Sequence, residues 1–219
     1  MSISGLSSVR DLPYAPRVLD WYDPFVHGFS NHFAWRCPTA RISSLYRAHV
    51  SSRHLDVGVG TGYFLDNAGI DERIDHLSLI DLNPECLSRT AERLRRFRPT
   101  RLHQDVRAPF QLGGSSFTSV SMTYLLHCVP GDMADKGIVF RNVSEVMRPG
   151  ATLFGATILG HGAPKSAIGR LLMSTYLRLG IFSNASDDEA SLRAAVEQGG
   201  FSQIDVWTEG CVGLFVAVK

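Results

Sequence analysis

The stretch "HLDVGVGTGYFLD", residues 54–66, decides the fold of this chain. A short apolar run meets three glycines at every second position, Gly58, Gly60 and Gly62, and Asp56 stands just before them. Glycine has no side chain, so a turn built from it lets the backbone approach a ligand closely. In open α/β sheets, ligands bind beyond the carboxyl ends of the strands. The stretch therefore predicts a strand, a ligand-binding turn and a helix.

The rest of the chain repeats this alternation of strand and helix. Further strands are expected at 76–81, 101–105, 117–126 and 151–159, with a closing antiparallel pair at 201–207 and 211–219. Helices are expected at 83–97, within 132–147, over 163–182 and after a capping box of Ser186 and Glu189. Strands that alternate with helices indicate an α/β fold whose parallel sheet is covered on both faces.

Composition limits the classes of function. The 219 residues suit one domain with an added cap, and a net charge of +1 favours neither a nucleic-acid nor a membrane partner. The arginine-rich run 89–101 is interpreted as the solvated face of an amphipathic helix rather than a nucleic-acid stripe. The four cysteines form no CxxC pair, which predicts reduced thiols and no metal site. No signal sequence or membrane-spanning run is visible, so we expect a cytoplasmic protein.

Two nucleotide-like ligands compete for the glycine turn. A dinucleotide would need a third glycine where Tyr63 stands, and Asp56 would repel its phosphates. S-adenosylmethionine has no phosphate and carries an ammonium and a sulfonium, which an acid attracts. Asp81, which ends the second strand, can accept the ribose hydroxyls of either ligand. Asp56 therefore favours S-adenosylmethionine, and a nicotinamide oxidoreductase is the less favoured alternative.

The adenine of such a ligand has candidate partners after the second and third strands. Leu82 can pack on the ring, Asp105 can accept from its amino group, and the Val106 amide can donate to a ring nitrogen. We also assign Thr123, in the fourth strand, to the cofactor site.

From about His54 to its C-terminus, the chain resembles class I S-adenosylmethionine-dependent methyltransferases. The matching segments are "LDVGVGTG", "LIDLNPECL", "HQDV", "FTSVSMTYLLHCVPG", "EVMRPGATL" and "EQGGFSQIDVW", in the family's order and spacing. The resemblance implies a Rossmann-like, doubly wound seven-stranded sheet, mostly parallel with an antiparallel last strand. It also implies a methyltransferase domain over 51–219, a helical N-terminal cap over 1–50 and a lid insertion at about 160–185.

The N-terminal segment carries a looser resemblance. "WYDPFVHGFSNHFAWR", residues 21–36, resembles the segment before the first motif in ubiquinone and menaquinone biosynthesis methyltransferases. The resemblance implies that Tyr22, Trp35 and Arg36 line the methionine end of the cofactor, with Arg36 near its carboxylate. The alternative is that these residues pack and brace the N-terminal helices.

Three residues are candidates for a general base. His127 follows the fourth strand, on the rim where the methyl group would lie, and a neutral imidazole there could accept a proton from the acceptor. His32 and Tyr22 are rival candidates in the cap. Each has a structural alternative, and methyl transfer needs a base only if the nucleophile must lose a proton.

The acceptor is expected to be a small, fairly apolar or aromatic molecule. The fourth strand ends in "TYLLHC" rather than the "D/N-P-P-Y/F/W" typical of methyltransferases that act on nucleobase amines. The helix over 163–182 is apolar on several faces and is expected to be buried on several faces, as a pocket roof, a dimer interface or core. We expect methylation of oxygen or nitrogen by a monomer or homodimer. The alternatives are an RNA or protein methyltransferase, or a relative that binds the cofactor without methyl transfer.

Overall fold

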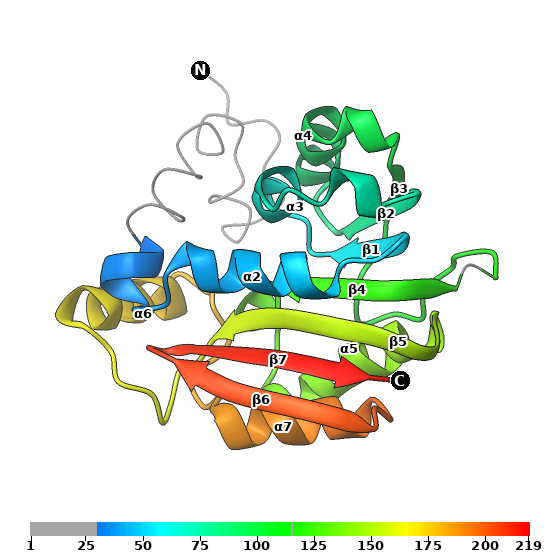
Figure 1. Cartoon of the computed structure of the whole chain (residues 1–219). Coiled ribbons are helices and arrows are strands. Elements are labelled where there is room, and N and C mark those ends of the chain that lie inside the picture. The colour runs from blue at the N-terminus through cyan, green and yellow to red at the C-terminus, as the bar shows by residue number, and fades with distance from the viewer. Residues whose placement is uncertain (1–29, 115) are drawn as a thin grey trace.

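The computed structural model describes residues 30–114 and 116–219, and these contain one seven-stranded sheet (Figure 1). Its strand order is β3-β2-β1-β4-β5-β7-β6. The strands are β1 (Arg53–Val57), β2 (His76–Asp81), β3 (Thr100–His103), β4 (Phe117–Thr123), β5 (Met147–Ile158), β6 (Gln203–Glu209) and β7 (Val212–Val218). The strands from β3 to β5 pair in parallel, whereas β7 pairs antiparallel with both β5 and β6. The predicted Rossmann-like fold with an antiparallel last strand is confirmed.

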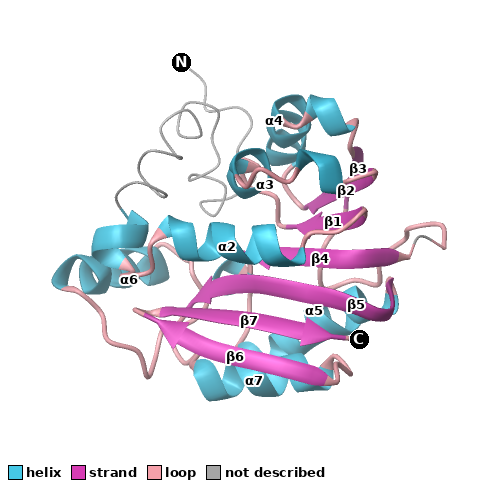
Figure 2. Ribbon diagram, viewed as in Figure 1, coloured by secondary structure: helices cyan, strands magenta, loops and turns pink. Residues whose placement is uncertain are grey.

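Helices cover both faces of the sheet (Figure 2). On one face lie α2 (Thr39–His49), α3 (Tyr63–Asn67) and α4 (Pro84–Arg93), and on the other lie α5 (Met133–Glu145) and α7 (Glu189–Gln198). The alternation along β5 serves both layers, because Phe154 belongs to the first core and Leu153 to the second. Helix α2 comes from the segment expected as a cap, yet it packs directly on the sheet, with Ile42 and Tyr46 buried.

Helix α4 and strand β4 both end earlier than the sequence predicts. Asn83 caps α4 as expected, since its side-chain oxygen accepts from the amide of Glu85 at 2.9 Å. The α-helix ends at Arg93, however, and a 3₁₀ turn (Arg95–Phe97) completes the segment. Strand β4 ends at Thr123 because Tyr124 takes a φ of 58°, which is not a strand conformation.

Helix α7 has a different cap from the predicted one. The predicted box of Ser186 and Glu189 is wrong, because the chain forms its capping box from Asp188 and Ser191. The Asp188 carboxylate accepts from the Ser191 amide at 2.8 Å, and the Ser191 hydroxyl oxygen accepts from the Asp188 amide at 2.9 Å. Aspartate caps helices as well as serine does, so the sequence alone does not distinguish Ser186 from Asp188 as the N-cap.

Helix α6 (Ala167–Arg178) lies at the edge of the sheet where β5 ends and is shorter than the predicted 163–182. Its side chains are not buried on several faces, which corrects the expectation from the sequence. Gly169 and Met173 are its buried residues, while Leu171 is 68% exposed. Only one face of α6 therefore rests on the chain. Among the described residues, no helix has the length and apolarity that crossing a membrane would require.

Candidate functional site

The glycine turn after β1 uses each of its three glycines differently. Gly58, Gly60 and Gly62 all have positive φ angles, of 75°, 52° and 71°. A Cβ atom on Gly58 would lie 2.8 Å from a methyl carbon of Leu125, and one on Gly62 would lie 2.8 Å from a methyl carbon of Thr90. A Cβ on Gly60 would meet nothing within 4 Å. Gly58 and Gly62 therefore permit close packing, and Gly60 faces open space where a ligand can approach.

Helix α4 holds the turn from behind. The Thr90 hydroxyl donates to the Gly60 carbonyl at 3.0 Å, and the Arg93 guanidinium donates to the Thr61 carbonyl at 2.7 Å. The sequence placed Arg93 on a solvated helix face and did not identify Thr90. A helix phase shows which residues share a face, but it does not show that this face meets the turn.

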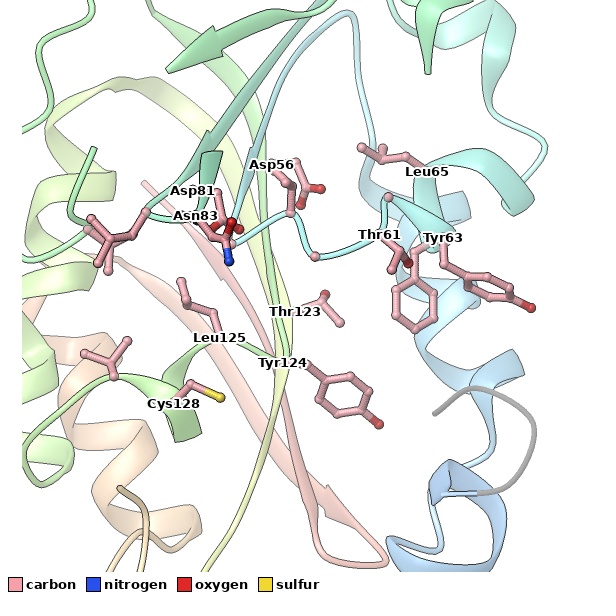
Figure 3. Close-up of a pocket in the computed structure, with 18 of the residues that line it drawn as sticks. Asp56, Thr61, Tyr63, Leu65, Asp81, Asn83, Thr123, Tyr124, Leu125 and Cys128 are labelled. Carbon is pink, nitrogen blue, oxygen red and sulfur yellow. Dashed lines mark hydrogen bonds between the residues drawn. The ribbon is translucent and has the colours of Figure 1, made fainter. Parts of the chain in front are cut away.

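The turn forms one wall of a cavity of about 290 Å³ (Figure 3). Its other walls come from the ends of β2, β3 and β4 and from α2, which is the ligand-binding edge of a doubly wound sheet. Every residue between positions 51 and 219 that the sequence assigned to the cofactor lines this cavity: Asp56, Gly58, Gly60, Gly62, Asp81, Leu82, Asp105, Val106 and Thr123.

Two carboxyl groups in the cavity are held away from solvent. Burial raises the pKa of Asp56 to about 7; the Ser121 hydroxyl opposes this rise and the negative charge of Asp81 adds to it. Burial also raises the pKa of Asp81 to about 6, although backbone amides, led by that of Asn83, stabilise its charge. A nearby cation stabilises the ionised form of such buried acids, whereas a nearby anion destabilises it. This favours a positively charged ligand over a pyrophosphate.

The third acid, Asp105, is already paired. The Arg107 guanidinium donates to it at 2.7 Å and the Arg107 amide at 2.9 Å, so that this arginine lowers the pKa of Asp105. Next to it, Val106 is buried, and its carbonyl accepts from the Asn142 side chain at 2.9 Å. Asp105 therefore lies at the expected place but would have to share its oxygens with Arg107.

A buried row of polar groups lies behind Asp56. The Ser121 hydroxyl donates to Asp56 Oδ1 at 2.6 Å, and the His54 ring lies between Ser121 (2.9 Å) and Ser119 (2.8 Å). The parallel register of β1 and β4 brings them together, since His54 is opposite Ser119 and Asp56 is opposite Ser121. The sequence motifs did not indicate this row. Its signal is the alternation of polar residues along each strand.

Two tyrosines that no sequence motif indicated also line the cavity. Tyr46, from α2, donates to the Thr123 hydroxyl at 3.2 Å and stacks on Phe64 with ring centroids 5.3 Å apart. Tyr124 follows β4 in its left-handed conformation, and its hydroxyl donates to Asn31 at 2.9 Å. A non-glycine residue with positive φ is strained, so the surrounding contacts must hold Tyr124 in place.

Comparison with known proteins identifies this arrangement. Residues 55–153 match the family described as "Methyltransferase domain". The chain is 39% identical to demethylluteothin O-methyltransferase of Streptomyces thioluteus over 204 residues, which are 93% of this chain and 88% of that protein. It is 38% identical to the physcion biosynthesis cluster O-methyltransferase of Aspergillus chevalieri, over 94% of this chain and 93% of that protein. The chain belongs to the S-adenosylmethionine-dependent methyltransferases.

A solved structure agrees with this assignment at the level of the fold. N-methyltransferase NodS of Bradyrhizobium japonicum, in complex with S-adenosyl-L-homocysteine, superposes with a TM-score of 0.59 at 15% identity. The match covers 82% of this chain and 86% of that one. The cavity of the present methyltransferase suits the cofactor of its family, because Gly60 leaves room for backbone contact and the cavity is lined by two acids with raised pKa, whose charge a cationic ligand would stabilise.

Among the residues that the structure describes, the methyltransferase presents neither predicted histidine base to this cavity. His127 is 4% exposed, and its Nδ1 accepts from the Ile158 amide at 3.4 Å. Burial lowers the pKa of His127 to about 3, which makes it a weak base, and it is not among the described residues of the cavity wall. His32 is exposed, lies edge-on to Phe33 and does not line the cavity either. Tyr22 lies outside the described residues.

The two remaining cofactor candidates also lie elsewhere in the methyltransferase. Trp35 is buried, its ring centroid is 6.2 Å from that of Phe182, and its carbonyl accepts from the Cys211 amide. Arg36 is exposed, with a φ of 57°. Neither belongs to the described wall of the cavity. The His127 ring also packs on Phe182, at 4.5 Å, so Trp35 and His127 meet in an aromatic cluster beside the cavity.

Proposed function

We propose that this methyltransferase methylates a hydroxyl oxygen of a small, fairly apolar or aromatic molecule. The observation that carries the proposal is the similarity, over nearly the whole chain, to two proteins named as O-methyltransferases. Such extended similarity includes the segments outside the cofactor motifs, and those segments shape the acceptor site.

The chemistry of the cavity supports a hydroxyl acceptor. Bound S-adenosylmethionine supplies a methyl group on a sulfonium that leaves readily, so the protein's task is to align the acceptor and exclude water. Tyr124, Leu125 and Cys128 give the cavity an apolar wall, and none of its described residues is a histidine. A phenol-like hydroxyl has a pKa of about 10 and needs only a weak base. Such an acceptor matches a cavity wall whose described residues include no histidine.

We assign the cofactor contacts as follows. Asp81 accepts the ribose hydroxyls, and Leu82, which is 60% exposed, packs on the adenine with the Val106 amide at its edge. Asp56 faces the cationic methionine end across the glycine turn. We further propose that residues 1–50 and about 160–185 enclose the acceptor, as cap and lid of a domain spanning 51–219.

The test compares acceptors that differ in one atom. The enzyme is incubated with methyl-labelled S-adenosylmethionine and matched phenols and anilines, and the products are identified by mass spectrometry. We expect methyl ethers from the phenols and at least ten-fold less label in the anilines. Predominant label in the anilines would replace oxygen with nitrogen as the target. Label in added RNA or protein alone would overturn the small-molecule proposal.

The cofactor assignment has its own control. Asp81→Ala should weaken S-adenosylhomocysteine binding more than ten-fold in calorimetric titration, because the ribose hydroxyls lose a charged acceptor. Asp75→Ala changes an exposed acid near the other end of the same strand and should leave binding unchanged. Equal affinity in the two variants would contradict the assignment of Asp81.

A further inference from the structure

Behind the cavity, one backbone amide and four buried polar side chains form a continuous hydrogen-bonded chain. Ser119 Oγ lies 2.9 Å from the Ser51 amide and 2.8 Å from His54 Nδ1. Ser121 Oγ lies 2.9 Å from His54 Nε2, on the other side of the ring, and 2.6 Å from Asp56 Oδ1. His54, Ser119 and Ser121 are each 0% exposed. Buried polar groups of this kind must satisfy one another, because no solvent is present to do so.

The number of protons in the chain fixes its direction. Ser121 has one hydroxyl proton, which it donates to Asp56, so its oxygen must accept from His54 Nε2–H. Burial lowers the pKa of His54 to about 3, so the ring is neutral and Nδ1 has no proton. Nδ1 therefore accepts from the Ser119 hydroxyl, whose oxygen accepts from the Ser51 amide. With an ionised Asp56 as the final acceptor, this direction gives every group in the chain a hydrogen-bond partner.

We propose that His54 is a positioning residue for cofactor binding: its Nε2–H tautomer turns the Ser121 hydroxyl toward Asp56 and so keeps that carboxylate ionised and oriented for the cationic end of S-adenosylmethionine. The inference rests on the proposed role of Asp56. If Asp56 takes a proton, it becomes a donor, and the chain can reverse so that Ser121 donates to Nε2. The tautomer of His54 thus follows the charge of Asp56.

The groups around Asp56 favour its protonation, which makes the donation from Ser121 important. Asp81 faces it from β2 with a like charge. Tyr46 faces it from α2 as a neutral phenol, because burial raises the pKa of Tyr46 well above its usual range. His54, on its own strand, is neutral as well. Only the Ser121 hydroxyl on β4 counteracts burial and the Asp81 charge.

The experiment measures S-adenosylhomocysteine binding by calorimetry from pH 5.5 to 9. Affinity should fall as the pH drops through about 7, where Asp56 takes its proton. In Ser121→Ala and His54→Leu, the pH midpoint should move up by about one unit, an affinity loss of about five-fold at pH 7 that approaches ten-fold at lower pH and recovers at pH 9.

Two variants serve as matched controls. His54→Gln keeps an N–H donor for Ser121, and Ser119→Ala breaks the chain only on the far side of the ring. Both change the same part of the core, and both should keep the original midpoint. A variant of His54 or Ser121 that loses affinity equally at every pH would show a purely structural effect and would overturn the proposal.

A spectroscopic measurement reads the tautomer directly. In ¹⁵N-labelled enzyme with S-adenosylhomocysteine at pH 8, the His54 ring should be neutral with its proton on Nε2, and a proton on Nδ1 would refute the inference. Asp56→Asn distinguishes the proposed role of Asp56 in cofactor binding from the inferred role of His54 in positioning it. If this variant binds the ligand normally at every pH, the role of Asp56 itself fails. If it binds weakly while His54→Leu binds normally, only the inference about His54 fails.

Discussion

At the scale of single residues, the three glycines of the turn share a conformation but differ in their neighbours. The spacing of the glycines predicts a tight turn, and all three have positive φ as that turn requires. The spacing cannot show that Gly62 contacts Thr90 while Gly60 faces the cavity, because those neighbours come from α4 and from open space. The sequence predicts the turn, and the packing decides the role of each glycine.

Substituting alanine at two of these positions should separate ligand binding from stability. In Gly60→Ala, the positive φ costs about 1 kcal/mol, and the new methyl group occupies ligand space, so S-adenosylhomocysteine affinity should fall about ten-fold or more. In Gly62→Ala, the clash with Thr90 should add roughly 1–3 kcal/mol to that strain. Calorimetric titration and urea unfolding measure the two effects.

A second substitution tests the cause of the Gly62 effect. Thr90→Ser removes the methyl carbon that the new Cβ would meet but keeps the hydroxyl that donates to the Gly60 carbonyl. Adding it to Gly62→Ala should therefore restore part of the lost stability. If it restores none, the destabilisation comes from the backbone alone.

At the scale of elements, the sequence predicts strands and helices well but not how they face one another. The polar alternation of Ser119, Ser121 and Thr123 along β4 is visible in the sequence, as is that of His54 and Asp56 along β1. Only the register of the two strands shows that these residues hydrogen-bond. Helix α6 illustrates the opposite failure: its apolar sequence indicates burial, yet Leu171 and Ile168 are exposed, since burial depends on neighbours as well as composition.

A buried ion pair joins two elements that the sequence does not connect. Lys136 of α5 donates to Asp187, before α7, at 2.5 Å, and both side chains are almost completely buried. The same ammonium donates to the Ser183 carbonyl, and the Ser183 amide donates to the carbonyl of His127. The pair therefore fixes the segment beside a 3₁₀ turn (Leu126–Cys128), and Cys128 of this turn lines the cavity.

Removing one partner of this pair should be costly. Lys136→Met leaves the Asp187 carboxylate buried without its cation and should cost about 3–5 kcal/mol of unfolding free energy, measured in urea. Adding Asp187→Leu should recover much of that loss, because no charge then remains buried. Arg95→Met, which breaks a largely exposed pair with Glu92, should change stability by less than about 1 kcal/mol. Equal effects of the two single variants would contradict the burial of the pair.

At the scale of the whole molecule, the accuracy of the sequence predictions follows the strength of the motifs. The ordered motifs after His54 correctly predicted a mostly parallel seven-stranded sheet with an antiparallel last strand, and the cofactor candidates that they indicated line the cavity. The looser N-terminal match placed Trp35 at the cofactor, but that side chain packs on Phe182 instead. His127 was expected on the rim because it follows β4, yet beyond the left-handed Tyr124 its side chain is buried in the core. Positions that follow a strand directly are predictable, whereas those beyond a turn are not.

The buried titratable groups of the whole molecule should give the cofactor-free enzyme an unusual pH dependence. The pKa values of His54 and His127 are lowered to about 3 in the folded protein. In the unfolded chain these histidines bind protons already near pH 6.5, so stability falls as the pH drops below about 6.5. The pKa values of Asp56 and Asp81 are raised to about 7 and 6, so their contribution is full below about pH 4 and is lost as the pH rises toward 7. The two contributions oppose each other between about pH 4 and 6.

Replacing one acid should expose this compensation. Asp56→Asn keeps an acceptor for Ser121 but cannot ionise, so it avoids the cost of burying a charge. Relative to the parent, its unfolding free energy should rise with pH between about 4 and 7, by up to about 1.4 kcal/mol per pH unit. Thermal unfolding without ligand at several pH values measures this difference, and Asp75→Asn, at an exposed acid, should show no such trend. A difference between Asp56→Asn and the parent that stayed constant with pH would mean that Asp56 has an ordinary pKa, because only a shifted group makes stability depend on pH in this way.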